Sequence, residues 1–131
     1  MPEIWHLYHV QNCRHARPVP KNKYVAIVCR DLEPMGFLIN SVIHRYIKNR
    51  PELYICQAFI EKANHKCLSR NSYVDCIDLY KFKDVELTED YGSISKRAVA
   101  RIKRAVSNSK TIEKRYKKLI LGKPKSSPKS S

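Results

Sequence analysis

The sequence of 131 residues contains no long hydrophobic run, and its first residues do not have the pattern of a secretory signal. No stretch of 18 or more consecutive apolar residues occurs, which excludes the pattern of a transmembrane helix. Residues 1–10, MPEIWHLYHV, lack the basic start and the apolar core of a secretory signal. No internal repeat is present. We therefore expect one domain that acts in the cytoplasm without a membrane partner.

The sequence also lacks the cysteine spacing of a structural zinc site. Its five cysteines are at positions 13, 29, 56, 67 and 76, and no two form a C-x₂-C pair. Zinc binding by Cys13 with His15 and by His65 with Cys67 stays an alternative, because residues two apart share one face of an extended strand. The cysteines in apolar runs are expected to be buried thiols. We expect neither a metal nor a cofactor.

Acidic residues are scarce in the C-terminal part of the chain. Residues 96–131 contain thirteen Lys and Arg and one acidic residue, Glu113. This segment therefore carries a net charge of +12, out of +14 for the whole chain. This charge favours a polyanionic partner such as RNA, DNA or an acidic protein. Residues 122–131, GKPKSSPKSS, have low complexity, and we expect a disordered basic tail that is either merely solvated or a non-specific phosphate binder. Residues 1–121 would form one domain.

The pattern of apolar residues predicts several short strands followed by helices. Strands are expected at 4–10, 24–29, 37–43, 53–60 and 73–82, with a further short strand as an option at 67–70. A basic exposed loop is expected at 11–23. Residues 44–52 should form a second basic loop or one short helical turn that Pro51 stops, and Pro34 and Gly36 should provide a turn at 30–36. Ser95 can cap a helix that runs to about residue 107, and a second helix should start near Thr111, with Leu119 on its apolar face. This order predicts an α+β fold, with a small antiparallel barrel or curled sheet and C-terminal helices.

The stretch 65–82, HKCLSRNSYVDCIDLYKF, crowds polar residues around a predicted strand. In one continuous strand, Asp75 and Asp78 face opposite sides and cannot act as a carboxylate pair. Asp78 would instead pair with a Lys or Arg of the helices or orient nearby backbone, and Ser72 would make a local hydrogen bond. His65 would lie exposed in a turn. These expectations give the stretch a structural role.

Five segments of the chain follow one another in a recognisable order: YVAIVC at 24–29, GFLINS at 36–41, NSYVDCIDLYKF at 71–82, VELTEDYGSIS at 85–95 and KRAVARIKRAV at 96–106. Over roughly residues 21–112, this order resembles the PemK/MazF-like toxins. The resemblance implies an SH3-like β-barrel with appended helices. It also implies a homodimeric endoribonuclease of a toxin–antitoxin system, which cuts single-stranded RNA without a metal. The implied partners are RNA, a second copy of the chain and an acidic antitoxin segment lying across the basic groove.

The resemblance also assigns residues to a cleavage site. In typical members, an arginine at the start of the first of these strands and a Thr or Ser after the next strand stand at that site. By position they correspond to Lys23 and Ser41. The lysine keeps the positive charge but lacks the planar fork that grips phosphate at two points. Arg17 and Arg30 are the candidates to supply it.

Metal-free RNA cleavage needs a base, an acid and a cation that stabilises the phosphorane-like transition state. Two basic loops supply such groups, and in the family's barrel both loops border one RNA groove. The candidate catalytic residues are Lys23, Ser41 and Arg30, with His15 and His44 as acid or base. The candidate RNA-binding residues are Arg14, Arg17, Lys21, Asn40, Arg45, Lys48 and Arg50.

Two other functions remain open at this point. The same fold could be a non-catalytic module that binds nucleic acid or a partner protein, which the lysine at position 23 and the tail-heavy charge favour. The helix at 95–107 could instead bind DNA through the basic side chains that crowd its polar face, Lys96, Arg97, Arg101, Lys103 and Arg104.

Overall fold

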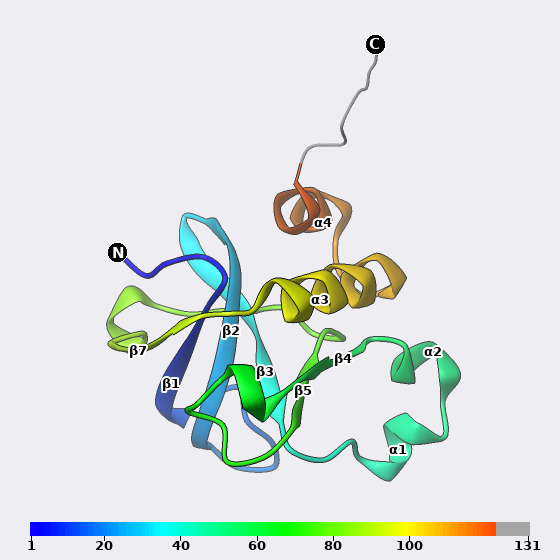
Figure 1. The fold of residues 1–131 in the computed structure, drawn as a ribbon. Helices are drawn as coiled ribbons and strands as arrows, with labels where there is room; N and C mark the ends of the chain where they lie inside the picture. Colours follow the sequence, from blue (N-terminus) through cyan, green and yellow to red (C-terminus); the bar gives the residue numbers. More distant parts are fainter. Residues whose placement is uncertain (123–131) are drawn as a thin grey trace.

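The computed structural model describes residues 1–122, so all but the first residue of the predicted tail lies outside the described residues. The strands are β1 His6–Cys13, β2 Lys21–Asp31, β3 Glu33–Asn40, β4 Gln57–Ile60, β5 Ser72–Asp75, β6 Tyr80–Lys81 and β7 Glu89–Ser93. The helices are α1 Arg45–Lys48, α2 Pro51–Tyr54, α3 Lys96–Asn108 and α4 Lys114–Leu121, with short 3₁₀ turns η1 Lys62–Asn64 and η2 Asp84–Glu86. The predicted α+β class, with two helices after the strands, is confirmed (Figure 1).

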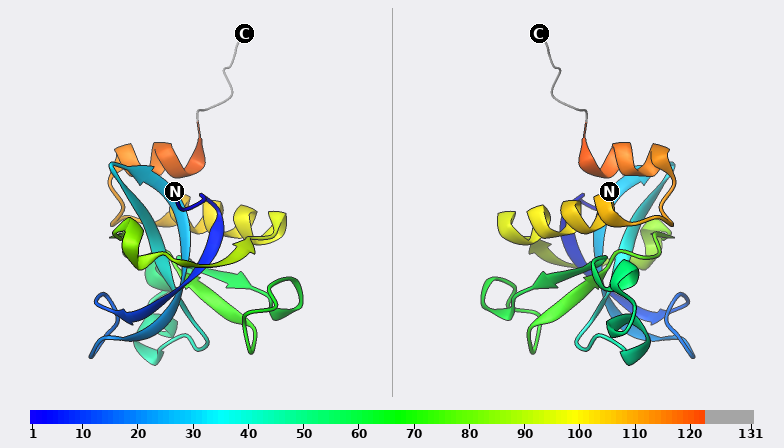
Figure 2. Two further views of the ribbon diagram at one scale, coloured as in Figure 1. Left: turned by 90° about the vertical axis from the view of Figure 1, so that its left-hand side faces the viewer. Right: turned by 90° about the vertical axis from the view of Figure 1, so that its right-hand side faces the viewer.

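The strands form one antiparallel sheet in the order β4-β5-β3-β2-β1-β7, with β6 paired to β3. Within residues 1–122, no pairing joins the outer strands β4 and β7, so the sheet is open and a closed barrel is not confirmed. The sheet is strongly twisted, α3 lies across it, and α4 lies beyond α3 (Figures 1 and 2).

The central strand β2 is covered on both faces, which is the usual environment of a uniformly apolar strand. Val25 and Ile27 belong to a smaller apolar cluster that includes Phe82. The alternate residues Ala26 and Val28 belong to the larger cluster, to which α3 and α4 contribute buried side chains. Because side chains alternate along a strand, one apolar segment joins the two halves of the core.

Helix α3 begins and packs as the sequence predicts. The Ser95 hydroxyl accepts a hydrogen bond from the Ala98 backbone N–H at 3.2 Å, which caps the first turn. Ala98, Ile102 and Val106 are fully buried against the sheet. Helix α4 begins at Lys114 instead of near Thr111, and Leu119 is 49% exposed, so its predicted place on the buried face is wrong.

The reversal between β2 and β3 is tighter than the predicted turn at 30–36. Leu32 alone separates the two strands and adopts a left-handed φ of 66°. Pro34 and Gly36 therefore lie inside β3. Glycine is required at position 36, because a Cβ there would lie 2.2 Å from the carbonyl oxygen of Ala26.

Several other predicted boundaries are wrong. Residues 53–60 begin as the end of helix α2, and only Gln57–Ile60 is a strand, because Pro51 starts a helical turn. The optional strand at 67–70 is absent from this described segment, and β1 extends through Cys13 into the predicted loop. The predicted strand at 73–82 is two strands, since β5 pairs with β4 and the end of β3 whereas β6 pairs with the start of β3. His65 is buried at 4% exposure, because the backbone N–H of Ser95 and the carbonyl of Glu61 supply its polar partners.

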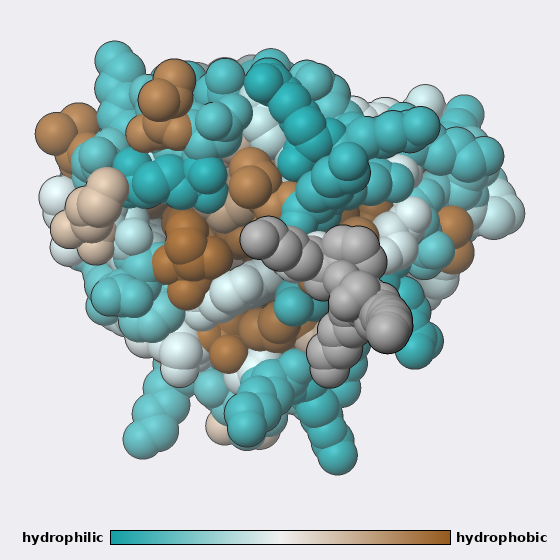
Figure 3. All heavy atoms as spheres, turned by 90° about the horizontal axis from the view of Figure 1, so that it is seen from above, coloured by the Kyte–Doolittle hydropathy of each residue, from teal (hydrophilic) through white to brown (hydrophobic). Residues whose placement is uncertain are grey.

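The surface of the described residues is mostly polar on the side of the helices (Figure 3). No helix within residues 1–122 has the length and apolar composition to cross a bilayer. The face seen from above the helices is mostly hydrophilic, with separate hydrophobic patches among the polar side chains (Figure 3). Separate patches of this kind are ordinary for a protein surface.

Candidate nucleic-acid cleft

A cleft of about 450 Å³ lies where β2 begins and β3 ends. Its walls come from the β1–β2 loop, the segment after β3, and the chain around β5 and β6. Seven predicted site residues line it: His15, Arg17, Lys21, Lys23, Asn40, Ser41 and His44. The two basic loops that sequence analysis singled out thus contribute to one cleft, which we call the Lys23 cleft.

Lys23 stands in the wall of this cleft, opposite Asn40. The antiparallel register that pairs Val25 with Leu38 sets the two residues across from each other, and the Lys23 Nζ donates a hydrogen bond to the Asn40 Oδ1. Burial is the main cause that lowers the pKa of Lys23, with the charge of Lys21 adding to it. A partly buried cation of this kind gains more from a bound anion than an exposed lysine does.

His15 is fixed beside the cleft by stacking and by one hydrogen bond. Its ring stacks on Tyr80, with 4.4 Å between the ring centroids, and meets Phe82 edge-on at 5.2 Å. Its Nε2 lies 2.8 Å from the carbonyl oxygen of Lys81 and must donate there, because a carbonyl only accepts. In the neutral ring, the lone pair is then on Nδ1, which can take up a proton.

His44 has the opposite arrangement. It caps α1, and its Nδ1 accepts the backbone N–H of Tyr46 at 3.2 Å. The neutral ring therefore carries its proton on Nε2, which can donate a hydrogen bond. Ser41 is exposed in the same wall, three residues before His44.

Two carboxylates also line the cleft, which corrects the prediction that Asp75 and Asp78 face opposite sides. The Asp75 Oδ1 accepts hydrogen bonds from the Gln57 side chain at 2.9 Å and from the Ile77 backbone N–H at 3.2 Å. The second bond turns the chain and ends β5, so the alternation of faces does not continue to Asp78. The end of the strand could have been predicted from the sequence, because aspartate is uncommon in strands and favours such turns.

Asp78 differs from Asp75 in having no bonded partner. Neither a hydrogen bond nor an ion pair engages its carboxylate within residues 1–122, so the predicted pairing with a helix Lys or Arg is wrong. Burial chiefly raises the pKa of Asp78, the charge of Asp75 raises it further, and Arg17 opposes the shift. An unpaired carboxyl that holds its proton more readily than usual can act as a general acid.

Arg30 does not reach the Lys23 cleft. It follows Lys23 by seven residues on β2, about 23 Å along an extended strand. Its guanidinium contacts Asp84 at 2.7 Å and the Leu32 carbonyl at 3.2 Å. Arg30 therefore lies outside the Lys23 cleft, whereas Arg17 is part of its lining.

Four predicted RNA-binding residues also lie outside the cleft lining. Arg14 is paired with Glu86 at 3.2 Å and donates to the Lys81 carbonyl. The guanidinium of Arg50 covers the Tyr46 ring, 3.7 Å from its centroid. The other two, Arg45 and Lys48, are exposed on α1.

Two of the basic side chains of α3 contact other residues of the domain. Arg101 pairs with Glu61 at 2.9 Å, and the Lys103 Nζ lies 5.6 Å from the centroid of the Trp5 ring. The described residues contain no group of three His, Cys, Asp or Glu side chains placed to hold a metal ion.

Comparisons with known proteins do not identify a family for the chain. No protein-family model matches it, and no curated protein has a similar sequence. The likeness to PemK/MazF-like toxins therefore rests on the five sequence segments alone.

Proposed function

We propose that the protein binds single-stranded RNA in the Lys23 cleft and cleaves it without a metal, as a PemK/MazF-like endoribonuclease of a toxin–antitoxin system. The observation that carries the proposal is the composition of the cleft. Three separate chain segments supply a partly buried cation, a hydroxyl, two histidines and a carboxyl with a raised pKa to one space of about 450 Å³. Cleavage of RNA by attack of a 2′-hydroxyl on the adjacent phosphate requires groups of these kinds.

The reaction starts at the ribose 2′-hydroxyl beside the scissile phosphate. A base takes the 2′-hydroxyl proton, the 2′-oxygen forms a bond to phosphorus, and the bond from phosphorus to the 5′-oxygen breaks. An acid then gives a proton to the leaving 5′-oxygen. The products are a 2′,3′-cyclic phosphate and a 5′-hydroxyl, and no outside reactant is consumed.

The hydrogen bonds of the two histidines suggest how the roles divide. His15 is the base, because the nitrogen left free in its neutral ring is the unprotonated Nδ1. His44 is the candidate acid in its imidazolium form, which carries a proton on each nitrogen and gives up the bond from the Tyr46 backbone N–H, and Asp78 is a second candidate acid. Lys23 and Arg17 neutralise the phosphate, and Ser41 hydrogen-bonds to it.

The fold and the partners implied by the family complete the proposal. Seven antiparallel strands that twist around a small apolar cluster support an SH3-like barrel in an opened form. A second copy of the chain would complete a homodimer. An acidic antitoxin segment would contact the cationic side of the cleft, where Arg17, Lys21 and Lys23 gather.

The test is incubation of the full chain with a long RNA in the presence of EDTA. We expect fragments that end in 2′,3′-cyclic phosphate, identified by mass spectrometry, and much slower cleavage by Ser41→Ala. Intact RNA at micromolar protein with a folded circular dichroism spectrum would refute cleavage.

A non-catalytic binding module on the same fold is the second candidate. It is favoured by the Lys23 side chain, which already donates a hydrogen bond to Asn40. This candidate predicts salt-sensitive binding of RNA or of an acidic protein with no change in RNA length.

A further inference from the structure

A second, smaller cavity of about 170 Å³ adjoins the Lys23 cleft at the same end of β2 and β3. Lys23 and Ser41 line both cavities. The side chains of β2 alternate, so Lys23 faces the same side as Val25 whereas Tyr24 packs on the side of the larger cluster. The two cavities therefore lie on opposite faces of the sheet, and Ser41, just after the end of β3, stands between them. We call the smaller one the Arg70 pocket.

The chemistry of the Arg70 pocket suits one nucleotide. Ile39 and Leu68 are buried in its wall, and Tyr24 adds an aromatic ring. Ser69 and Arg70 are exposed at its rim. No acidic side chain belongs to its described lining, in contrast to the Lys23 cleft. A base can contact the apolar wall while the guanidinium of Arg70 pairs with a phosphate.

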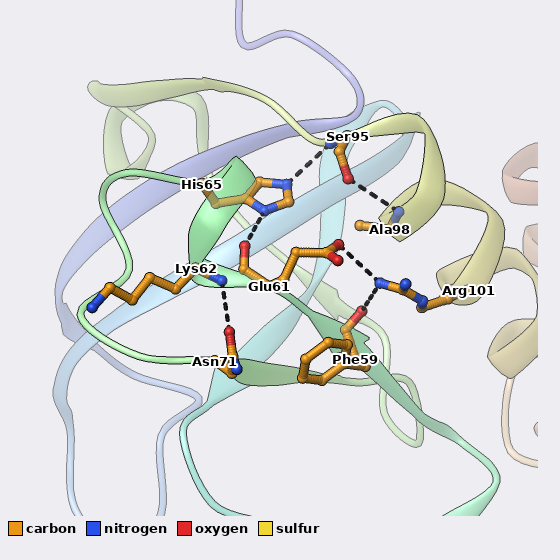
Figure 4. Close-up of polar contacts among 8 residues, drawn as sticks. All are labelled: Phe59, Glu61, Lys62, His65, Asn71, Ser95, Ala98 and Arg101. Atoms are coloured by element: carbon orange, nitrogen blue, oxygen red, sulfur yellow. Dashed lines mark hydrogen bonds and ion pairs between the residues drawn. The ribbon is translucent and has the colours of Figure 1, made fainter.

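The loop that presents Arg70 is held in place by several hydrogen bonds (Figure 4). The Lys62 backbone N–H donates to the Asn71 Oδ1 at 3.0 Å, which joins the two ends of the loop. His65 donates from Nδ1 to the Glu61 carbonyl at 2.7 Å and accepts the Ser95 backbone N–H at Nε2, at 3.0 Å.

These bonds tie the loop to the start of α3. The Arg70 side chain itself has no ion pair or hydrogen bond among residues 1–122. A free cation on a fixed loop is preorganised, because little ordering of the backbone is needed when an anion binds.

The size of the pocket argues that its ligand extends beyond it. Sites for whole small molecules usually measure about 300 to 1,000 Å³. A cavity of about 170 Å³ that shares two lining residues with a larger cleft fits one unit of a longer chain. Single-stranded RNA offers such units, because its bases are unstacked and can be bound one by one.

We propose that the Arg70 pocket binds the nucleotide next to the scissile phosphate, so that the RNA strand passes over Ser41 from the Lys23 cleft into this pocket. The inference rests on the proposed function and extends it. It assigns Arg70, Tyr24 and Leu68 to a subsite that the resemblance does not imply.

The test uses single-stranded RNA oligonucleotides with one cleavage position each, shortened one nucleotide at a time from either end. We expect Arg70→Ala in the full chain to lower kcat/KM on the longest oligonucleotide by about twofold to fivefold, because Arg70 is exposed and an exposed charge contributes about 1 kcal/mol or less. The loss should disappear once truncation removes the nucleotide that occupies the pocket. Lys66→Ala is the matched control, because it removes an exposed cation from the same loop outside the pocket lining.

The other outcomes separate the subsite from the proposed function. Cleavage that Arg70→Ala and Lys66→Ala affect equally at every length overturns the subsite and leaves the cleavage proposal standing. If the wild-type chain binds the oligonucleotides without cutting them, Kd is measured for the same length series. A loss of affinity in Arg70→Ala that disappears with the same nucleotide then supports the subsite, and a loss equal to that of Lys66→Ala at every length overturns it. If it neither binds nor cleaves any of them, both proposals are overturned.

Discussion

Replacing Lys23 by methionine is expected to remove most RNA cleavage while the fold persists. Methionine keeps the length and the apolar stem of the side chain but not its charge. Because burial lowers the pKa of Lys23, the charged form is disfavoured in the folded state, and the folded protein is less stable for it at neutral pH. Loss of activity without loss of stability would therefore identify a functional residue.

The magnitude follows from the surroundings of the side chain. A hydrogen bond to a charged group contributes about 1.5 to 3 kcal/mol, and about 1.4 kcal/mol corresponds to a factor of ten in rate. Lys23→Met should thus lower kcat/KM by about tenfold to a hundredfold. Lys21 lies two residues earlier on the same face but is exposed, and an exposed charge contributes about 1 kcal/mol or less. Lys21→Met should lower kcat/KM by less than about fivefold.

The assay is single-turnover cleavage of a labelled oligonucleotide by both variants, at low salt and at about 0.5 M salt. The effect of Lys21→Met should fade at high salt because exposed charges are screened, whereas that of Lys23→Met should persist. Equal losses in both variants that vanish together at high salt would refute a specific phosphate contact. The cleft would then attract RNA only through its general charge.

Three further predictions concern stability. Gly36→Ala should destabilise the domain by about 1 to 3 kcal/mol, measured by urea unfolding, because the added Cβ meets the backbone of Ala26; unchanged stability would contradict that close approach. Asp78→Asn should stabilise the protein by less than about 1 kcal/mol at pH 7 but not near pH 3. The fold raises the pKa of this carboxyl above 3.8, so its ionised form lowers stability at neutral pH and the cost vanishes once it is protonated in both states. A less stable Asp78→Asn variant at pH 7 would contradict this. Ser95→Ala should cost about 1 kcal/mol in thermal unfolding through loss of the α3 cap, whereas Ser107→Ala, exposed near the end of the same helix, should cost less; equal costs would argue against the cap.

Local sequence signals predict the elements that depend on local chemistry. The uniformly apolar run at 24–29 predicts a strand, and it lies within β2, Lys21–Asp31. The helical spacing of apolar residues after Ser95 indicates α3, because both the cap and the buried face are set within a few residues. The positions of the two basic loops are likewise clear from the sequence, as are seven of the residues that line the Lys23 cleft.

Local patterns fail where the choice of partner decides the structure. A period of two through residues 73–82 separates Asp75 from Asp78, but β5 and β6 pair with different parts of β3 and the chain turns between them. His65 has no apolar neighbourhood in the sequence, yet it is buried because a backbone N–H at the start of α3 supplies its partner from 30 residues away.

The sequence by itself thus determined the α+β class, the strand at 24–29, the capped helix and the cationic residues that line the cleft. Tertiary structure alone decided that Arg30 is remote, that two aspartates enter the cleft, and that Arg70 lies beside Lys23 and Ser41. The physical reason is range. Caps and hydrophobic periods act within one or two turns of chain, whereas strand register and loop anchoring join residues that are tens of positions apart.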